Sequence, residues 1–257
     1  MYDLLTTTRS DPYLERLNWN HPPAHPPSPF LLLHFHLDRL RDAALAHEWP
    51  EAHAALDYPA LADACHAAVA SHAPDPAAAF RIRILLSRSG ALTAEARPVA
   101  PLKFDPTSPS FSKPLKDSAT LYGPAMTLFL DTQPTPPAGL FTTTKTTERT
   151  VYNDARTRVG LPPLPSDDPA DVVLYNPAGH ITETSVSNVA FYHADTWLTP
   201  PLSSGCLPGV LRRWLLQHKR IREAEEGELT KDALRPGHWV LLFNSVYGCR
   251  LGRITAL

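Results

Sequence analysis

The sequence predicts an α+β protein made of two halves, and three observations lead to this prediction. The first half reads as strands, then helices, then strands, whereas the second half reads mainly as a meander of strands. A proline-rich stretch without periodicity, residues 105–124, separates them. Of 257 residues, 43% are hydrophobic, which is ample for a real core. We therefore expect a smaller N-terminal domain at 1–104, a linker at 105–124 and a larger C-terminal domain at 125–257.

The first half contains six predicted elements in the order β-β-α-α-β-β. "LLTTTR" reads as a strand, and the segment "FLLLHFHL" at 30–37 reads as the start of another. Apolar residues at helical spacing predict helices over 36–48 and 58–73. Residues 80–99 read as a β-hairpin around a Ser-Gly turn.

The second half begins with a predicted strand at 125–132 and a helix that Gly160 ends. The segment "DVVLYNPAGHITETSVSNVAFYHADTWLTPP" reads as a meander of strands with turns at 176–179 and 193–195. "PGVLRRWLLQHK" reads as a helix with proline near its start, and residues 238–251 read as one late strand.

Composition excludes several classes of protein. The formal net charge is −2, and no basic block indicates a nucleic-acid partner. No apolar run approaches the roughly 18 residues of a membrane span, and the N-terminus lacks the form of a signal peptide. Cys65, Cys206 and Cys249 are isolated and odd in number, so we interpret them as reduced thiols of a cytoplasmic protein.

Lys145 lies among threonines just before a predicted helix. Three other features of the sequence support a functional role for this lysine. Glu183 lies in a strand-like stretch where a carboxylate needs a donor or a cation. "SSGCLPGVLRRW" leads small residues into a helix, whose first amides can bind an anion. His36 and Arg39 are one helical turn apart, and an arginine fork can hold a phosphate.

Each feature also has an ordinary interpretation: an exposed lysine, an exposed strand position, a plain entry into a helix, and a surface arginine. Together they match what pyridoxal 5′-phosphate (PLP) requires: a lysine amine, a carboxylate for the ring nitrogen, and a phosphate site. Metal binding is a weaker alternative, because His34 and His36 alternate without a cluster of further ligands. We therefore expect no metal site.

Four ordered motifs make the sequence similar to the class IV aminotransferase family, also called PLP fold type IV. They are "HLDRL" at 36–40, Lys145 followed by a helix, Glu183 with Asn188, and Leu207-Pro208-Gly209 before a helix. The resemblance covers nearly the whole chain. It implies the D-amino acid aminotransferase-like α+β fold, with two domains and the cofactor in the cleft between them, and a homodimer.

The resemblance also implies roles for individual residues. Lys145 forms the covalent imine with PLP, Glu183 binds the pyridine nitrogen, and Arg39 binds the phosphate. The rest of the cofactor site would be Asn188, Gly209, Val210, Leu211 and Ser245. The substrate side would contain Thr6, Thr7, Arg83, Arg149 and Tyr247.

Within the family, "KTTERTVYNDAR" and "NSVYGCR" resemble the lyase domain fused to aminodeoxychorismate synthase, and "LLTTTR" is similar to a strand of stand-alone lyases. The implied activity converts 4-amino-4-deoxychorismate to 4-aminobenzoate and pyruvate, a step of folate biosynthesis. Two departures are Thr6, where many relatives carry glutamate, and a shorter N-terminal stretch. The alternatives are a transaminase for a D-amino acid or an (R)-amine, and a non-catalytic protein of the same fold.

Overall fold

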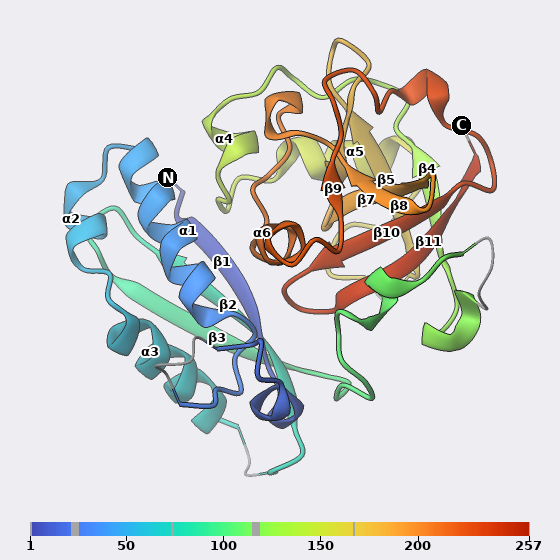
Figure 1. The fold of residues 1–257 in the computed structure, drawn as a ribbon. Coiled ribbons are helices and arrows are strands. Elements are labelled where there is room, and N and C mark those ends of the chain that lie inside the picture. The colour runs from blue at the N-terminus through green and yellow to red at the C-terminus, as the bar shows by residue number, and fades with distance from the viewer. Residues whose placement is uncertain (1, 22–25, 73–74, 115–118, 167, 257) are drawn as a thin grey trace. The chain divides into compact units, whose positions relative to one another are not determined.

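The computed structural model describes residues 2–21, 26–72, 75–114, 119–166 and 168–256 (Figure 1). The chain divides into two compact units, and the division does not follow chain order. Unit 1 comprises residues 1–105 and 144–148, and unit 2 comprises residues 106–143 and 149–257. Both units combine helices with a sheet, as the sequence predicts.

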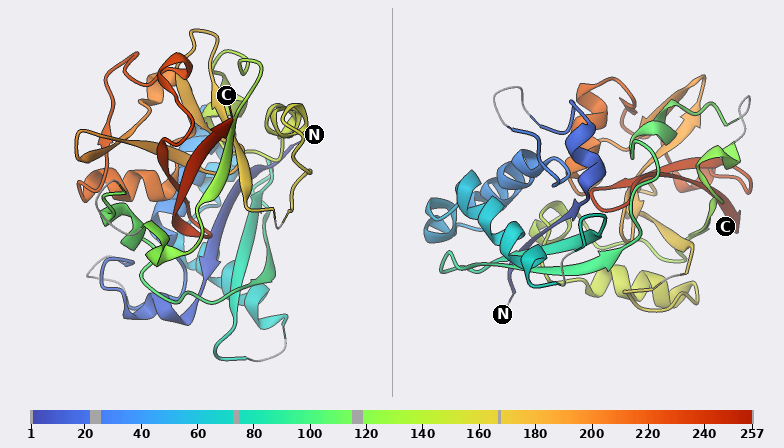
Figure 2. Two further views of the ribbon diagram at one scale, coloured as in Figure 1. Left: turned by 90° about the vertical axis from the view of Figure 1, so that its right-hand side faces the viewer. Right: turned by 90° about the horizontal axis from the view of Figure 1, so that it is seen from below.

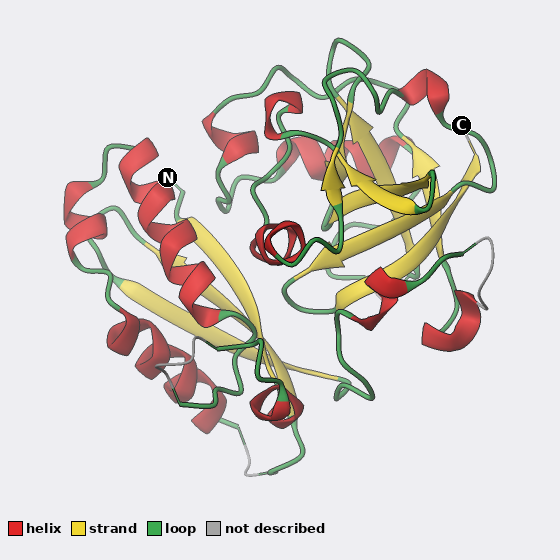
Figure 3. Cartoon of the chain, in the orientation of Figure 1, coloured by secondary structure: helices red, strands yellow, loops and turns green. Residues whose placement is uncertain are grey.

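Unit 1 contains a three-stranded antiparallel sheet in the order β1-β2-β3, with its helices packed on one face (Figure 3). Side chains alternate between the two faces of β1, so that Leu4, Thr6 and Thr8 lie opposite buried residues of β2. The elements are β1 (Leu4–Ser10), η1 (Pro12–Arg16), α1 (Leu33–Ala46), α2 (Pro50–Ala54), α3 (Tyr58–Ala70), β2 (Ala79–Leu86) and β3 (Leu92–Val99).

The prediction of a strand at 30–37 is wrong, because α1 begins at Leu33. The backbone turns into the helix through Leu32, whose φ is 51°, and the Leu32 amide donates to Oδ1 of Asn20 at 2.8 Å. This partner lies 12 residues earlier in the chain, so the local pattern of apolar residues does not reveal it.

Unit 2 contains an eight-stranded mixed sheet in the order β6-β5-β4-β11-β10-β7-β8-β9. The long strands β10 and β11 run side by side, with β4 along the other edge of β11 (Figure 2). Alternate residues of β5 enter two cores, and α5 packs over the core that contains Val172 and Leu174. The strands are β4 (Met126–Leu130), β5 (Ala170–Tyr175), β6 (Ile181–Thr184), β7 (Asn188–His193), β8 (Thr196–Thr199), β9 (Arg222–Glu223), β10 (Trp239–Asn244) and β11 (Gly248–Ala256). The helices are η2 (Ser108–Phe111), η3 (Ala119–Tyr122), α4 (Leu140–Thr143), α5 (Thr150–Arg158), η4 (Leu202–Ser204), α6 (Val210–Gln217) and η5 (Lys231–Ala233).

Three expectations for the second half differ from the structure. The late strand is a hairpin, because Gly248 turns the chain with a φ of 70° between β10 and β11. The described part of 105–124 belongs almost wholly to unit 2, where the Cys249 amide donates to the Pro106 carbonyl at 2.7 Å; residues 115–118 lie outside the described chain. Residues 144–148, expected in the C-terminal domain, belong to unit 1 because they pair with β1.

Candidate active site

Arg39 is the centre of a buried polar cluster in unit 1. It projects from α1, and its Nη2 donates to Oγ1 of Thr6 and lies 3.3 Å from Nδ1 of His36. Oγ1 of Thr6 is 2.6 Å from the same His36 nitrogen. Because a guanidinium only donates, the Thr6 oxygen accepts from Arg39 and its own hydrogen can go to His36. Nε of Arg39 is buried and has no hydrogen-bond partner among the described residues.

Burial changes the acidity of both bases in this cluster. Loss of solvent lowers the pKa of Arg39 to about 10, so that the guanidinium is still charged at neutral pH. Burial, and then the charges of Arg39, His34 and Lys145, hold the pKa of His36 well below 6.5. The neutral His36 ring therefore lies beside the charged, half-buried guanidinium of Arg39. Arg39 has no carboxylate partner among the described residues.

Lys145 lies on the segment that extends the sheet of unit 1. Its carbonyl accepts from the Leu5 amide at 2.8 Å, and the next residue, Thr146, pairs with Leu4. The Lys145 side chain is half-buried, and its charge acts on His36. Sheet pairing therefore fixes the backbone of Lys145 near the Arg39 cluster.

The predicted substrate-side residues of unit 1 lie on opposite faces of β1. Thr6 faces α1 and contacts Arg39, whereas Thr7 faces the other way and pairs with Arg83 of β2. Thr7 and Arg83 are half-buried. The substrate-side assignment of these three residues stays a prediction.

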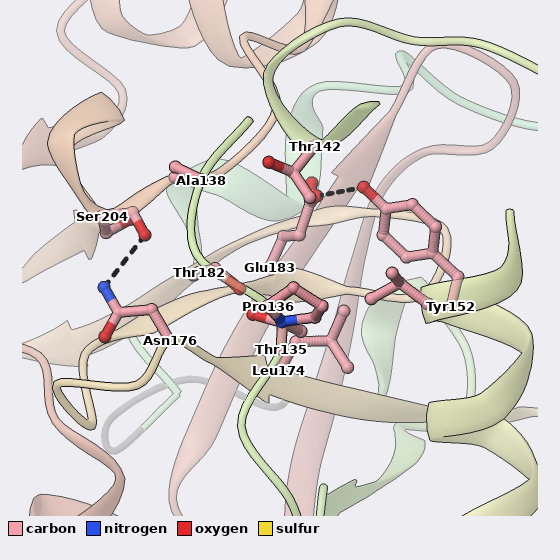
Figure 4. A pocket seen from close by; sticks show the side chains of 12 residues that line it. Thr135, Pro136, Ala138, Thr142, Tyr152, Leu174, Asn176, Thr182, Glu183 and Ser204 are labelled. Atoms are coloured by element: carbon pink, nitrogen blue, oxygen red, sulfur yellow. Dashed lines mark hydrogen bonds between the residues drawn. The ribbon is translucent and has the colours of Figure 1, made fainter. Parts of the chain in front are cut away.

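Glu183 is the buried carboxylate of unit 2, and its side chain is 6% exposed. The hairpin from β5 to β6 positions it, since Oδ1 of Asn176 accepts from the Ala178 and His180 amides at 3.0 Å in the turn. Its Oε1 accepts from the Tyr152 hydroxyl at 2.8 Å (Figure 4). Its Oε2 lies 3.4 Å from Nδ2 of Asn188. A small pocket lies against Tyr152 and Glu183.

Asn188 links Glu183 to the start of α6. Its Nδ2 donates to the Leu207 carbonyl at 2.8 Å, and a Cβ at Gly209 would lie 1.9 Å from its Oδ1. Any larger residue at position 209 would therefore require the Asn188 side chain to move. Gly209 begins α6 without a side-chain cap, so the amides of Val210 and Leu211 are presented at the helix start.

The turn from β10 to β11 carries the last two predicted site residues. Ser245 is buried and Tyr247 is 41% exposed, with the guanidinium of Arg250 4.0 Å from the Tyr247 ring. Nδ2 of Asn244 donates to Oγ of Ser187 at 3.0 Å, which ties this turn to the residue before Asn188.

Tyr152 is not among the site residues predicted from the sequence, because the helical pattern does not show which side chain meets Glu183. Arg149, predicted on the substrate side, lies over the Tyr152 ring at 4.9 Å and donates to the Ser185 carbonyl at 2.7 Å.

Among the described residues, no three acidic, histidine or cysteine side chains form a group that could hold a metal ion. In the same part of the chain, no helix is both long enough and apolar enough to cross a membrane.

Residues 15–253 match the family model for class IV aminotransferases. The chain belongs to the class IV aminotransferase family. A protein of Schizosaccharomyces pombe named as a candidate aminodeoxychorismate lyase is 34% identical over 169 residues, 64% of this chain and 62% of that protein. An aminodeoxychorismate lyase of Saccharomyces cerevisiae is 31% identical over 196 residues, 68% of this chain and 51% of that protein. Each match therefore spans less than two thirds of the relative.

A solved structure of a candidate amino-acid aminotransferase from Mesorhizobium loti is similar along its whole length. Its TM-score is 0.69, with 26% identity and full coverage of both chains. The predicted fold of class IV aminotransferases, PLP fold type IV, is therefore confirmed.

Class IV aminotransferases use PLP, and PLP is the cofactor of this chain. Groups of each unit, considered separately, suit parts of this cofactor. In unit 1, Arg39 is a half-buried cation whose Nε has no hydrogen-bond partner among the described residues, which suits a phosphate. In unit 2, α6 begins with uncapped amides. Glu183 is a buried carboxylate that receives two donors, which suits a protonated ring nitrogen.

Proposed function

We propose that this chain is an aminodeoxychorismate lyase, which converts 4-amino-4-deoxychorismate to 4-aminobenzoate and pyruvate. The observation that carries this choice within the family is the identity of 34% and 31% to two yeast proteins named for that activity. Loss of the enolpyruvyl group makes the ring aromatic, so that the reaction needs no second substrate.

The proposed roles of the residues follow from their chemistry. When bound, PLP supplies an aldehyde that condenses with amines and a ring that accepts electrons. Lys145 holds the cofactor through its amine and moves the proton of the substrate carbon. Glu183 accepts a hydrogen bond from the ring nitrogen and keeps that nitrogen protonated. Arg39 and the amides at the start of α6, Val210 and Leu211, bind the phosphate.

Borohydride reduction followed by peptide mapping tests the cofactor assignment. We expect the reduced adduct on Lys145, and Lys145→Ala should bind PLP noncovalently while turnover falls by several orders of magnitude. An adduct on another lysine would overturn the role of Lys145.

The substrate is tested with purified protein and 4-amino-4-deoxychorismate in the absence of any keto acid. We expect 4-aminobenzoate and pyruvate in equal amounts over many turnovers. A second tube contains D-alanine or an (R)-amine in place of that substrate. Conversion there to the pyridoxamine form of the cofactor, without turnover in the first tube, would refute the lyase.

A transaminase for a D-amino acid or an (R)-amine is the second candidate. The full-length similarity to the Mesorhizobium loti protein, named as a candidate aminotransferase, favours it. It uses the same Lys145, Glu183 and Arg39, so only the substrate experiment separates the two activities.

We also propose that the chain acts as a homodimer in the cytoplasm. Unit 2 carries exposed apolar side chains, Leu140, Phe141 and Leu202, each at least 43% exposed. Apolar surface of this kind is common where copies of a chain associate. The three free cysteines are buried and unlinked, which suits a reducing compartment.

A further inference from the structure

Tyr152 and Glu183 come from different elements of unit 2 and point toward one another (Figure 4). Tyr152 lies in the first turn of α5, and Glu183 lies in β6. The tyrosine hydroxyl donates to Oε1 of Glu183 at 2.8 Å, whereas the other carboxylate oxygen lies 3.4 Å from the Asn188 amide nitrogen. Of these two contacts with the carboxylate, the hydrogen bond from Tyr152 is the shorter and the better formed.

We propose that Tyr152 is a positioning residue for Glu183, holding the carboxylate in one orientation and in its ionised form. This inference rests on the proposed role of Glu183 at the ring nitrogen of PLP. A hydrogen bond donated to a carboxylate oxygen stabilises the charged form over the protonated one.

The tyrosine is itself held in place. The guanidinium of Arg149 lies 4.9 Å from the centre of the Tyr152 ring, and Nη2 of Arg149 donates to the Ser185 carbonyl at 2.7 Å. Arg149 therefore links the Tyr152 ring on α5 to the turn that follows β6. A fixed donor loses little conformational entropy when it orients a carboxylate.

The hydroxyl also keeps its proton. Burial, followed by the adjacent charge of Glu183, raises the pKa of Tyr152 well above 10. The other groups whose charges act on Tyr152 are Arg149 and Cys206. Burial raises the pKa of Cys206 to about 12, so its thiol is neutral at physiological pH. The Tyr152 hydroxyl therefore stays protonated, and can donate a hydrogen bond, across the pH range of the test below.

The test measures the dissociation constant of PLP for the apoprotein between pH 5 and pH 9. Tyr152→Phe removes one oxygen, so protonation of Glu183 should become easier. We expect affinity within about twofold of wild type at pH 9, and an acid-side loss of affinity that begins about one pH unit higher. At pH 6 this shift corresponds to a dissociation constant up to about tenfold weaker than that of the wild type.

The double variant separates this role from a merely structural one. In a Glu183→Gln background, Tyr152→Phe should leave the pH profile unchanged, since no carboxylate remains to be held. Equal weakening by Tyr152→Phe at every pH, or the same weakening in both backgrounds, would overturn the inference. Tyr192→Phe is the matched control, because Tyr192 bonds an exposed carboxylate, Asp195, at 3.1 Å.

If Tyr152→Phe does not fold, a second variant provides the same test. Fluorotyrosine at position 152 keeps the shape and donates more strongly, so it should move the acid limb to lower pH. No movement would overturn the inference. If Glu183→Gln alone leaves PLP affinity and its pH profile unchanged, the proposed role of Glu183 fails, and that result differs from a failure confined to Tyr152.

Discussion

Arg39 is half-buried and has no carboxylate beside it in the described chain, unlike the buried arginines. Arg9, Arg156 and Arg212 are each at most 4% exposed and lie 2.7 to 3.5 Å from a carboxylate oxygen. Arg39 instead contacts a threonine and a neutral histidine. A buried charge is normally paired, because its desolvation is costly. This arrangement supports the proposal that Arg39 binds an anion, the phosphate of PLP.

Arg39→Met tests this interpretation, because it replaces the charge with an apolar side chain of similar length. We expect unchanged or higher stability of the apoprotein in urea, together with at least a tenfold weaker affinity for PLP. Arg156→Met is the control, since it leaves Asp171 buried without its cation and should cost about 3 kcal/mol. If Arg39→Met destabilises the apoprotein as much as the control, the arginine has a structural role instead.

His36 gives the apoprotein a characteristic response to acid. Its folded pKa lies well below its unfolded value of about 6.5. Below that pH the unfolded chain binds more protons than the folded one, so the free energy of unfolding falls as pH drops. His36→Gln keeps an acceptor for Thr6 and should flatten this decline as the pH falls below about 6.5.

The measurement is the free energy of unfolding in urea at a series of pH values. His53→Gln is the control, since His53 is a half-buried histidine of α2 outside the cluster. Parallel curves for wild type and His36→Gln would contradict the prediction.

At the scale of elements, the β10–β11 hairpin depends on a close approach at its turn. Gly248 has a φ of 70°, and a Cβ there would lie 2.4 Å from Cβ of Pro106. Pro106 begins unit 2, so this contact connects its first residues to a central hairpin of its sheet. Both the backbone conformation and the contact require glycine.

Gly248→Ala should therefore destabilise the protein by at least about 3 kcal/mol. Gly160→Ala is the matched control: its φ is 75°, but nothing lies within 4 Å of an added Cβ. It should cost only the backbone strain, about 1–2 kcal/mol. Urea unfolding of both variants measures the difference, and equal losses would show that the Pro106 contact contributes nothing.

At the scale of the whole molecule, each unit has its own core, and the family fold spans both. If the chain is a homodimer as proposed, light scattering of active enzyme should give twice 28.3 kDa. Phe141→Glu places a charge among the exposed apolar side chains of unit 2 and should shift the equilibrium toward the monomer. A mass of 28.3 kDa for fully active wild-type enzyme would refute the dimer.

Local patterns predicted most elements of the fold, and the residue types predicted the cofactor. The hairpin at 80–99, the meander from 171 and the helix after Pro208 form as expected, since each is specified by nearby turn and periodicity signals. The apolar run at 30–37 led to the wrong prediction of a strand. The helix starts there because the Leu32 amide donates to Asn20, a contact that the local pattern does not show. The late strand was predicted without its Gly248 turn, although glycine at that position is a readable signal.

What the sequence could not predict is which distant residues meet. Lys145 follows β1 by about 140 positions, yet its backbone bonds to Leu5. Tyr152 meets Glu183 across 31 positions, and nothing in the helical pattern selects that contact. The residue types indicated a PLP enzyme, whereas the partners that orient them depend on the fold.

The pairing of residues 144–148 with β1 limits where the chain can be divided into separately expressed fragments. β1 is an edge strand of its sheet, and this short segment covers part of that edge through Leu5–Lys145 and Asp3–Thr147 backbone bonds. A fragment that stops at residue 105 lacks the segment and exposes the edge, which invites strand-to-strand aggregation. Split-protein reporters or separately expressed halves should therefore fail at the proline-rich junction. The N-terminal piece would become soluble only when a peptide containing residues 144–148 is supplied or fused to it.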